Sequence, residues 1–205
     1  MTTKKQVNVA VLVSGGGTNL QALIDAQNAG VITDGKIVLV VSNKQGAYAL
    51  ERAKNNGISS ATVLKKDYAT QTDFEDAILA LFKDYSVDLV VLAGFLSILS
   101  PHFINAYRNR IINVHPSLIP SFCGKGYYGL KVHEEALKYG VKVTGATVHF
   151  VNEIPDGGAI IMQKAVAIRD CDTPQTLQQR VMKIAEWKIL PQAVQKVSKQ
   201  ILQEN

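Results

Sequence analysis

The sequence is poor in cysteine and has no long apolar run. Its 205 residues include only two cysteines, Cys123 and Cys171, which do not have the spacing of metal ligands. No apolar stretch approaches the roughly 20 residues that a membrane helix needs. We therefore expect a cytoplasmic protein that makes no use of a membrane and has no cysteine-based metal site.

Clusters of like charge and of aromatic residues are also missing. Lys and Arg number 22 against 17 Asp and Glu, for a formal charge of +5, but the basic residues are scattered, with a modest concentration at 183–199. Aromatic residues are not interleaved with them, as they are in surfaces that bind single-stranded nucleic acid. We interpret the excess as a solvated basic surface and expect no nucleic-acid partner; steering of anionic small molecules is the alternative.

The first half of the chain alternates apolar, β-branched runs with segments of helical periodicity. Strands are predicted at residues 7–13, 37–41, 89–93 and 111–114, and helices from Asn19 and over 47–56 and 72–85. Nearly continuous apolar strands joined by helices indicate a parallel sheet with helices on both faces. The length and the 47% hydrophobic content fit one domain over 1–205.

The pattern changes after His115. Residues 141–151 and 159–168 are two long strand candidates separated by turn residues, which predicts an antiparallel pair. Residues 173–203 are predicted to be helical, with Pro191 as a candidate break. The predicted class is therefore α/β, a mostly parallel twisted sheet with an antiparallel strand pair near the C-terminus.

A glycine-rich turn, Ser14-Gly15-Gly16-Gly17-Thr18-Asn19, joins the first strand to the first helix. The free N–H groups and positive dipole end of that helix would face the turn, which suits a phosphate. The turn lacks the lysine of a P-loop and the third glycine of the dinucleotide fingerprint. A tight turn without a ligand is the other interpretation.

The polar residues Asn113 and His115 lie two apart at the end of a predicted strand, so they share one face at the edge where open α/β sheets bind ligands. Imidazole titrates near neutrality, so His115 can shuttle a proton, and the Asn113 amide can donate a hydrogen bond to an oxyanion. Asp156, if it lies near, would orient His115 and raise its pKa, or hold a water for proton relay. The alternatives are a structural histidine and a turn aspartate.

Five segments together resemble the glycinamide ribonucleotide formyltransferase family, in the family's order and over nearly the whole chain. They are 14–23, 41–44, 92–101, 113–120 and 144–158. The resemblance implies a Rossmann-like formyltransferase fold that moves the formyl group of 10-formyltetrahydrofolate to the amine of 5-phosphoribosylglycinamide in purine synthesis. It makes Asn113, His115 and Asp156 the catalytic trio: Asn113 and protonated His115 stabilise the oxyanion, Asp156 holds the charge, and no metal takes part.

The resemblance also implies binding residues. It divides the domain into a nucleotide-binding half, 1–100, and a catalytic and folate-binding half, 101–205. The residues expected to bind the ribonucleotide are Gly16, Gly17, Thr18, Asn19 and Glu186. Those expected around the folate are Leu96, Ser97, Ile98, Leu99, Asn113, Asn152, Glu153, Ile154, Pro155 and Asp156.

Several positions depart from the family pattern. Ser97 and Gln71 stand where basic residues are common, so the contacts to the folate's carboxylate tail are expected either to be weaker or to come from Lys65 or Lys66. Trp187 replaces a histidine, and the longer segment 121–130 is interpreted as a mobile flap.

The alternatives for the function are a formyltetrahydrofolate hydrolase, another folate-dependent formyltransferase, and a binding module without activity. The expected partners are the two small-molecule substrates, and the expected assembly is a monomer or a weak homodimer.

Overall fold

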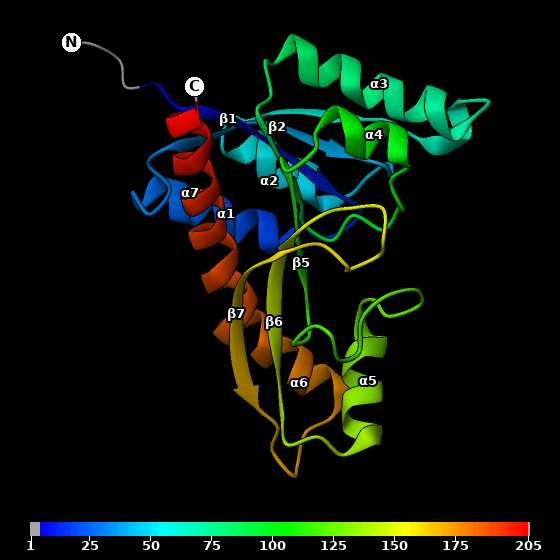
Figure 1. The fold of residues 1–205 in the computed structure, drawn as a ribbon, viewed down its shortest axis with the longest axis vertical. Helices are drawn as coiled ribbons and strands as arrows, with labels where there is room; N and C mark the ends of the chain where they lie inside the picture. Colours follow the sequence, from blue (N-terminus) through cyan, green and yellow to red (C-terminus); the bar gives the residue numbers. More distant parts are fainter. Residues whose placement is uncertain (1–4, 205) are drawn as a thin grey trace.

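The computed structural model describes residues 5–204, in which seven strands form one sheet (Figure 1). The strand order is β3-β2-β1-β4-β5-β6-β7, so the sheet is continuous through both halves of the chain. The strands are β1 Val7–Val13, β2 Gly35–Ser42, β3 Ser59–Thr62, β4 Leu89–Leu92, β5 Ile111–His115, β6 Val143–Phe150 and β7 Ile160–Ala167. The predicted α/β class is confirmed, although β3 has no counterpart among the predicted strands.

The type of strand pairing changes once along the sheet, from parallel to antiparallel after β5. The pairs from β3 to β5 are all parallel, whereas β5 with β6 and β6 with β7 are antiparallel. The predicted antiparallel pair is thus confirmed. In the β5–β6 register Asn113 lies opposite His149, and His115 lies opposite Thr147. The carboxyl end of β5 is therefore flanked by polar residues of β6.

Helices cover both faces of this sheet, as predicted. They are α1 Thr18–Asn28, α2 Tyr48–Asn55, α3 Gln71–Asp84, α4 Pro101–Ala106, α5 Leu130–Tyr139, α6 Pro174–Val181 and α7 Trp187–Glu204, with a 3₁₀ turn at Lys65–Asp67 and a π-helical turn at Met182–Glu186. No helix was expected where α4 and α5 lie. Helix α4 has only six residues, too few for a clear apolar period.

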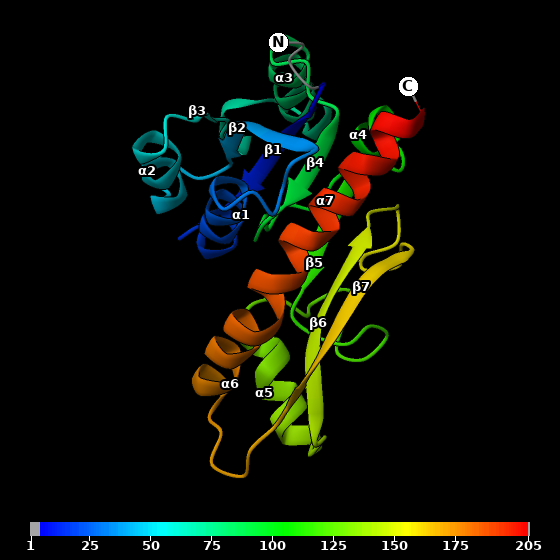
Figure 2. The same cartoon turned by 90° about the vertical axis from the view of Figure 1, so that its left-hand side faces the viewer.

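Each face of the sheet has its own apolar core. Alternate residues of β1 divide between the two cores: Val9 and Val11 face α1 and α7, whereas Ala10 and Leu12 face α3 and α4. Figure 2 shows the long helix α7 lying across one face of the sheet. Burial on both faces is why the central strands consist almost entirely of apolar residues.

The C-terminal helical region is continuous through Pro191, so the candidate break at this residue is not present. The irregular turn lies just before it, at Met182–Glu186. A proline at 191 cannot donate to the carbonyl of residue 187, and this missing bond directly follows the π-helical turn, where the hydrogen-bond pattern has already shifted.

None of the helices within residues 5–204 is both long enough and apolar enough to cross a bilayer.

Candidate functional site

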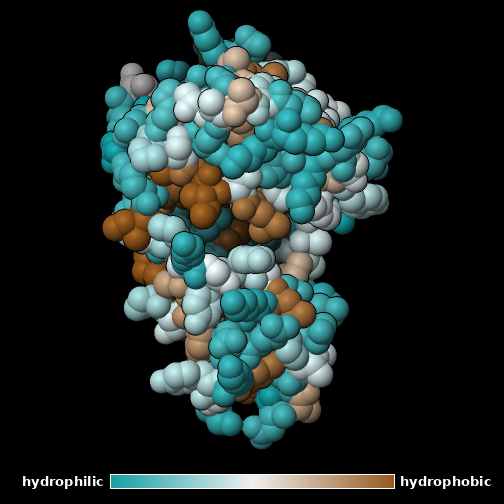
Figure 3. Space-filling model, turned by 90° about the vertical axis from the view of Figure 1, so that its right-hand side faces the viewer, coloured by the Kyte–Doolittle hydropathy of each residue, from teal (hydrophilic) through white to brown (hydrophobic). Residues whose placement is uncertain are grey.

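Two neighbouring cavities open at the carboxyl ends of β4 and β5. The larger has a volume of about 570 Å³, and the smaller, of about 140 Å³, shares Asn113 and Asp156 with it. Figure 3 shows the hollow between the upper and lower parts of the molecule, with apolar side chains at its rim. The location agrees with the expected crevice at the carboxyl edge of an open α/β sheet.

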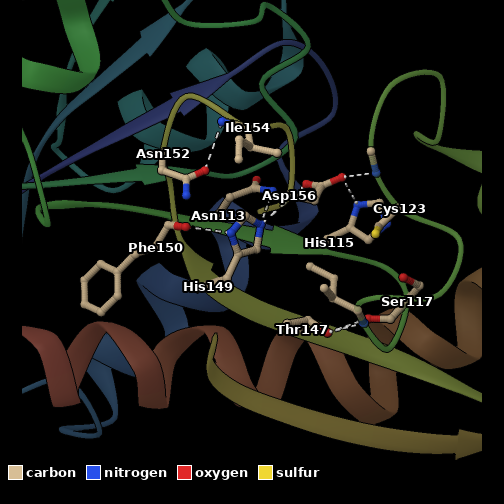
Figure 4. A network of polar contacts seen from close by, with 12 residues as sticks. Asn113, His115, Ser117, Cys123, Thr147, His149, Phe150, Asn152, Ile154 and Asp156 are labelled. Atoms are coloured by element: carbon tan, nitrogen blue, oxygen red, sulfur yellow. Dashed lines mark hydrogen bonds and ion pairs between the residues drawn. The ribbon is translucent and has the colours of Figure 1, made fainter. Parts of the chain in front are cut away.

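His115 is the last residue of β5, and only 4% of it is exposed. Its Nε2 donates to the carbonyl oxygen of Phe122, 2.9 Å away, because that oxygen can only accept. Its Nδ1 therefore lacks a hydrogen in the neutral ring and lies 3.6 Å from Asp156 Oδ2 (Figure 4). Burial lowers the pKa of His115 below its usual value, and the opposing effects of Asp156 and the Phe122 carbonyl do not restore it. At neutral pH His115 is consequently uncharged and able to accept a proton.

Asp156 projects from the loop between β6 and β7. Its backbone is left-handed, with φ of 56°, and a Cβ on Gly158, two residues later, would lie 1.8 Å from the Phe150 carbonyl oxygen. Glycine at 158 therefore lets the loop fold tightly over the end of β6. Asp156 Oδ2 accepts a hydrogen bond of 2.8 Å from the backbone N–H of Gly124.

The carboxyl of Asp156 is ionised despite its burial. Burial by itself raises its pKa, but the hydrogen bond with His149, the electrostatic effect of the nearby His115 ring and the Gly124 N–H together lower the pKa below its usual value. A negative charge is thus fixed beside the neutral imidazole of His115.

Asn113 contacts a second histidine rather than His115. Its Nδ2 lies 3.2 Å from His149 Nε2, while His149 Nδ1 is 2.7 Å from the Phe150 carbonyl oxygen and donates to it. The same Nε2 also lies 3.5 Å from Asp156 Oδ1, so one ring nitrogen contacts both the Asn113 amide and the Asp156 carboxylate. His149 therefore links Asn113 to Asp156 and fixes the direction in which the Asn113 amide points.

Glu186 lies in the π-helical turn, and only 6% of it is exposed. Its Oε2 accepts a hydrogen bond of 2.7 Å from Asn19 Nδ2, across 167 positions of the chain. Burial raises the pKa of Glu186 to about 7, even though the bond from Asn19 acts in the opposite direction. Both residues line the larger cavity with His115. The structure thus brings two of the predicted ribonucleotide-binding residues to one wall.

The predicted phosphate-binding turn lies beside this cavity. Gly16, Gly17 and Thr18 are not among the residues that line it, and Thr18 lines a different hollow with Trp187. The turn reaches the cavity only through Asn19.

The residues predicted to surround a folate do lie together. Ser97, Ile98, Leu99 and the segment from Asn152 to Asp156 line the smaller cavity, and Leu96 lines the larger one. Leu96, Ile98 and Ile154 are 56%, 72% and 66% exposed, which is unusual for clustered apolar side chains and fits a slot for a flat apolar ligand.

Ser97 and Gln71, which stand where the family commonly has basic residues, form hydrogen bonds within the protein. Ser97 Oγ accepts from Asn43 Nδ2 at 2.8 Å, and Gln71 Nε2 donates to Glu75 Oε1 at 2.7 Å. Neither Lys65 nor Lys66 lines the two cavities.

No group of three or more His, Cys, Asp or Glu side chains suited to a metal ion occurs in the part of the chain that the structure describes. The arrangement offers proton transfer at His115, a fixed negative charge at Asp156 and a hydrogen-bond donor at Asn113.

Comparison with known proteins identifies the family of the chain. The family model described as "Formyl transferase" matches residues 7–194. The phosphoribosylglycinamide formyltransferase of Haemophilus influenzae is 43% identical over 89% of this chain and 83% of its own. The chain belongs to the phosphoribosylglycinamide formyltransferase family. The human trifunctional purine biosynthetic protein adenosine-3 is 45% identical over 95% of this chain, which spans 19% of that longer protein.

Solved structures of phosphoribosylglycinamide formyltransferases share the fold. Glycinamide ribonucleotide transformylase 1 from Symbiobacterium toebii has a TM-score of 0.90 and 38% identity, over 97% of this chain and 90% of that one. The Brucella melitensis phosphoribosylglycinamide formyltransferase has a TM-score of 0.87 and 42% identity, over 95% and 96% of the two chains. The Rossmann-like formyltransferase fold is therefore confirmed.

Three contributors to this site were not predicted. His149 lies within segment 144–158, but the sequence gives it no role; its pairing with Asn113 follows once β5 and β6 are known to be antiparallel. The Phe122 carbonyl and the Gly124 N–H come from segment 121–130, which carries no signal for backbone contacts. Segment 121–130 contacts His115 and Asp156 through these backbone groups. Its mobility stays a prediction.

Replacing Glu186 with Gln should remove a pH-dependent cost of folding. The carboxyl releases its proton near its ordinary pKa of 4.5 when unfolded and near 7 when folded. Between these values the folded protein holds a proton that the unfolded chain has lost, so the free energy of unfolding of the wild type falls as pH rises. The free energy of unfolding of E186Q, relative to that of the wild type, should therefore increase over this pH range by up to about 3 kcal/mol.

Chemical denaturation across that pH range measures the difference, with Glu134→Gln at an exposed position as the control. If the difference in free energy of unfolding between E186Q and the wild type does not vary with pH, the raised pKa of the buried Glu186 carboxyl would be contradicted.

Proposed function

We propose that this chain transfers the formyl group of 10-formyltetrahydrofolate to the amine of 5-phosphoribosylglycinamide, a step of purine synthesis. The observation that carries the proposal is the convergence of Asn113, His115 and Asp156 beside two joined cavities, in a chain of this family. The larger cavity suits a ribonucleotide between Asn19, Glu186 and His115, and the smaller suits the pterin of the folate. We also propose a cytoplasmic location, on the ground that Cys123 and Cys171 are free thiols.

The reaction forms a bond between the amine nitrogen and the formyl carbon and breaks the bond from that carbon to the folate N10. One proton moves from the amine to N10. His115 suits this transfer because its neutral Nδ1 can accept the proton while Nε2 stays bonded to the Phe122 carbonyl. Asp156 then faces an imidazolium and stabilises it, so the protonated His115 expected from the family resemblance arises during turnover rather than before it.

Asn113 has the complementary role. His149 holds its amide in place, and the Asn113 Nδ2 group can donate to the negative charge that develops on the formyl oxygen. A donor held in advance by β5 and β6 needs no reorganisation when the charge appears. Residues 1–100 would then bind the nucleotide, and residues 101–205 would carry the catalytic trio and most of the folate site. The exception is the segment from Leu96 to Leu99, which places part of the folate site in the first half.

The proposed roles of the binding residues are based on where these residues lie around the two cavities. Gly16, Gly17, Thr18 and Asn19 would hold the phosphate end and Glu186 the sugar, while the loop from Asn152 would present backbone groups to the pterin edge. Lys65 and Lys66 remain proposed contacts for the folate tail.

Incubation of the purified chain with both substrates tests the function directly. Formylated 5-phosphoribosylglycinamide supports the proposal. Release of formate without need for the amine would indicate a formyltetrahydrofolate hydrolase instead, and binding of both compounds without turnover would indicate a module without activity.

Replacing His115 with Ala should lower kcat by about 10²- to 10⁴-fold, the usual effect of losing a general acid–base. Binding of the folate should be retained, because the smaller cavity does not include His115. His102→Ala, at an exposed histidine paired with Asp76 on the surface, is the matched control. Near wild-type turnover in H115A would show that the proton is moved by another group.

A further inference from the structure

The turn before α1 is backed by α2. Its residue Gly17 is left-handed, with φ of 69°, and a Cβ there would lie 2.6 Å from the Ala49 Cβ. The backbone N–H of Ala49 donates to the Gly15 carbonyl at 3.1 Å. Only glycine at position 17 lets the first turn of α2 approach this closely.

Arg52, one turn further along α2, holds the next carbonyl of the turn. Its Nε donates to the Gly16 carbonyl oxygen at 2.8 Å, and its Nη1 donates to Gln21 Oε1 on α1 at 3.0 Å. The guanidinium also lies 4.9 Å from the centre of the Tyr48 ring. Three groups therefore fix its orientation, although none of them is a carboxylate.

These contacts determine where the N–H groups of the turn point. In a trans peptide the C=O and N–H groups point in opposite directions, and the only cis bond within residues 5–204 joins Ile119 to Pro120. Because the carbonyls of Gly15 and Gly16 are directed at α2, the N–H groups of Gly16 and Gly17 point away from it. Neither N–H has a hydrogen-bond partner among the described residues.

The charges around the turn are not balanced by the protein. Helix α1 has no acidic residue in its first turn and no side-chain cap, and its positive dipole end lies beside the turn. Arg52 adds a full positive charge, and no carboxylate within residues 5–204 forms an ion pair with it. An anion at the free N–H groups would offset this excess.

We propose that Arg52 is a positioning residue for the substrate phosphate: it holds the Gly16 carbonyl against α2, directs the Gly16 and Gly17 N–H groups outward, and supplies positive charge from behind the turn. The inference rests on the proposed function, because it names the residue that would make the turn selective for a phosphorylated amine over its dephosphorylated form.

Steady-state kinetics of Arg52→Ala with 5-phosphoribosylglycinamide and with its dephosphorylated riboside test the inference. The KM for the phosphorylated substrate should rise about ten- to hundredfold, as expected for the loss of a hydrogen bond to a charged group. The kcat and the KM for the folate should stay near wild type, and kcat/KM for the riboside should not change. Lys54→Ala, which removes an exposed charge from the same helix, should leave all parameters unchanged.

Arg52→Lys separates the effect of the positive charge from that of the guanidinium geometry. It also provides the test if the alanine variant does not fold. It keeps the charge but loses the fixed Nε contact, so its KM should lie between those of wild type and R52A. Equal losses with the phosphorylated substrate and the riboside, or an unchanged KM for the phosphorylated substrate, would overturn the role of Arg52.

Titration with inorganic phosphate, followed by the unfolding midpoint, gives a readout that needs no turnover. Phosphate should raise the midpoint of wild type and K54A more than that of the Arg52 variants. Equal shifts in all proteins would contradict the inference. Absence of formyl transfer by the wild type would instead contradict the proposed function, so the two failures can be told apart.

Discussion

The site depends on one contact between segments that are far apart in the sequence, in which the Asp156 carboxylate faces the His115 imidazole. His115 is held by the end of β5, and Asp156 by a tight loop that only the antiparallel β6–β7 pair brings back over that end. The backbone N–H of Gly124 completes the arrangement by bonding to the same carboxylate oxygen. The switch from parallel to antiparallel pairing after β5 is thus what makes the chemistry available.

Burial makes this contact effective. A carboxylate taken out of water is costly unless its surroundings compensate, and here contacts with His149, His115 and the Gly124 N–H keep the pKa of Asp156 below its usual value. His115, which is more deeply buried than Asp156, stays neutral in the free protein. A proton that reaches His115 therefore arrives beside a charge already in place, which lowers the cost of forming the imidazolium without any movement of the chain.

The sequence predicted most of this framework, because its signals are local. Apolar runs located the central strands, a stripe that includes Phe74, Ile78 and Phe82 located α3, and the change of pattern after His115 located the antiparallel pair. The resemblance selected Asn113, His115 and Asp156 from many polar residues. What escaped were the short elements β3 and α4, helix α5, and partners set by backbone geometry.

The protonation states were also beyond the sequence. The raised pKa of Glu186 follows from its burial in a π-helical turn. No residue pattern in the sequence predicted this turn. The neutral state of His115 likewise follows from a depth that only the packed fold defines, and it reverses the starting charge that the resemblance implied.

The most direct measurement of the central contact is an NMR titration of the His115 ring in the wild type and in Asp156→Asn. The carboxylate raises the pKa of His115 against the larger effect of burial, so its removal should lower that pKa further below the usual value. An unchanged or higher pKa for His115 in D156N would show that the two groups do not interact, and the proposed proton transfer would lose its physical basis.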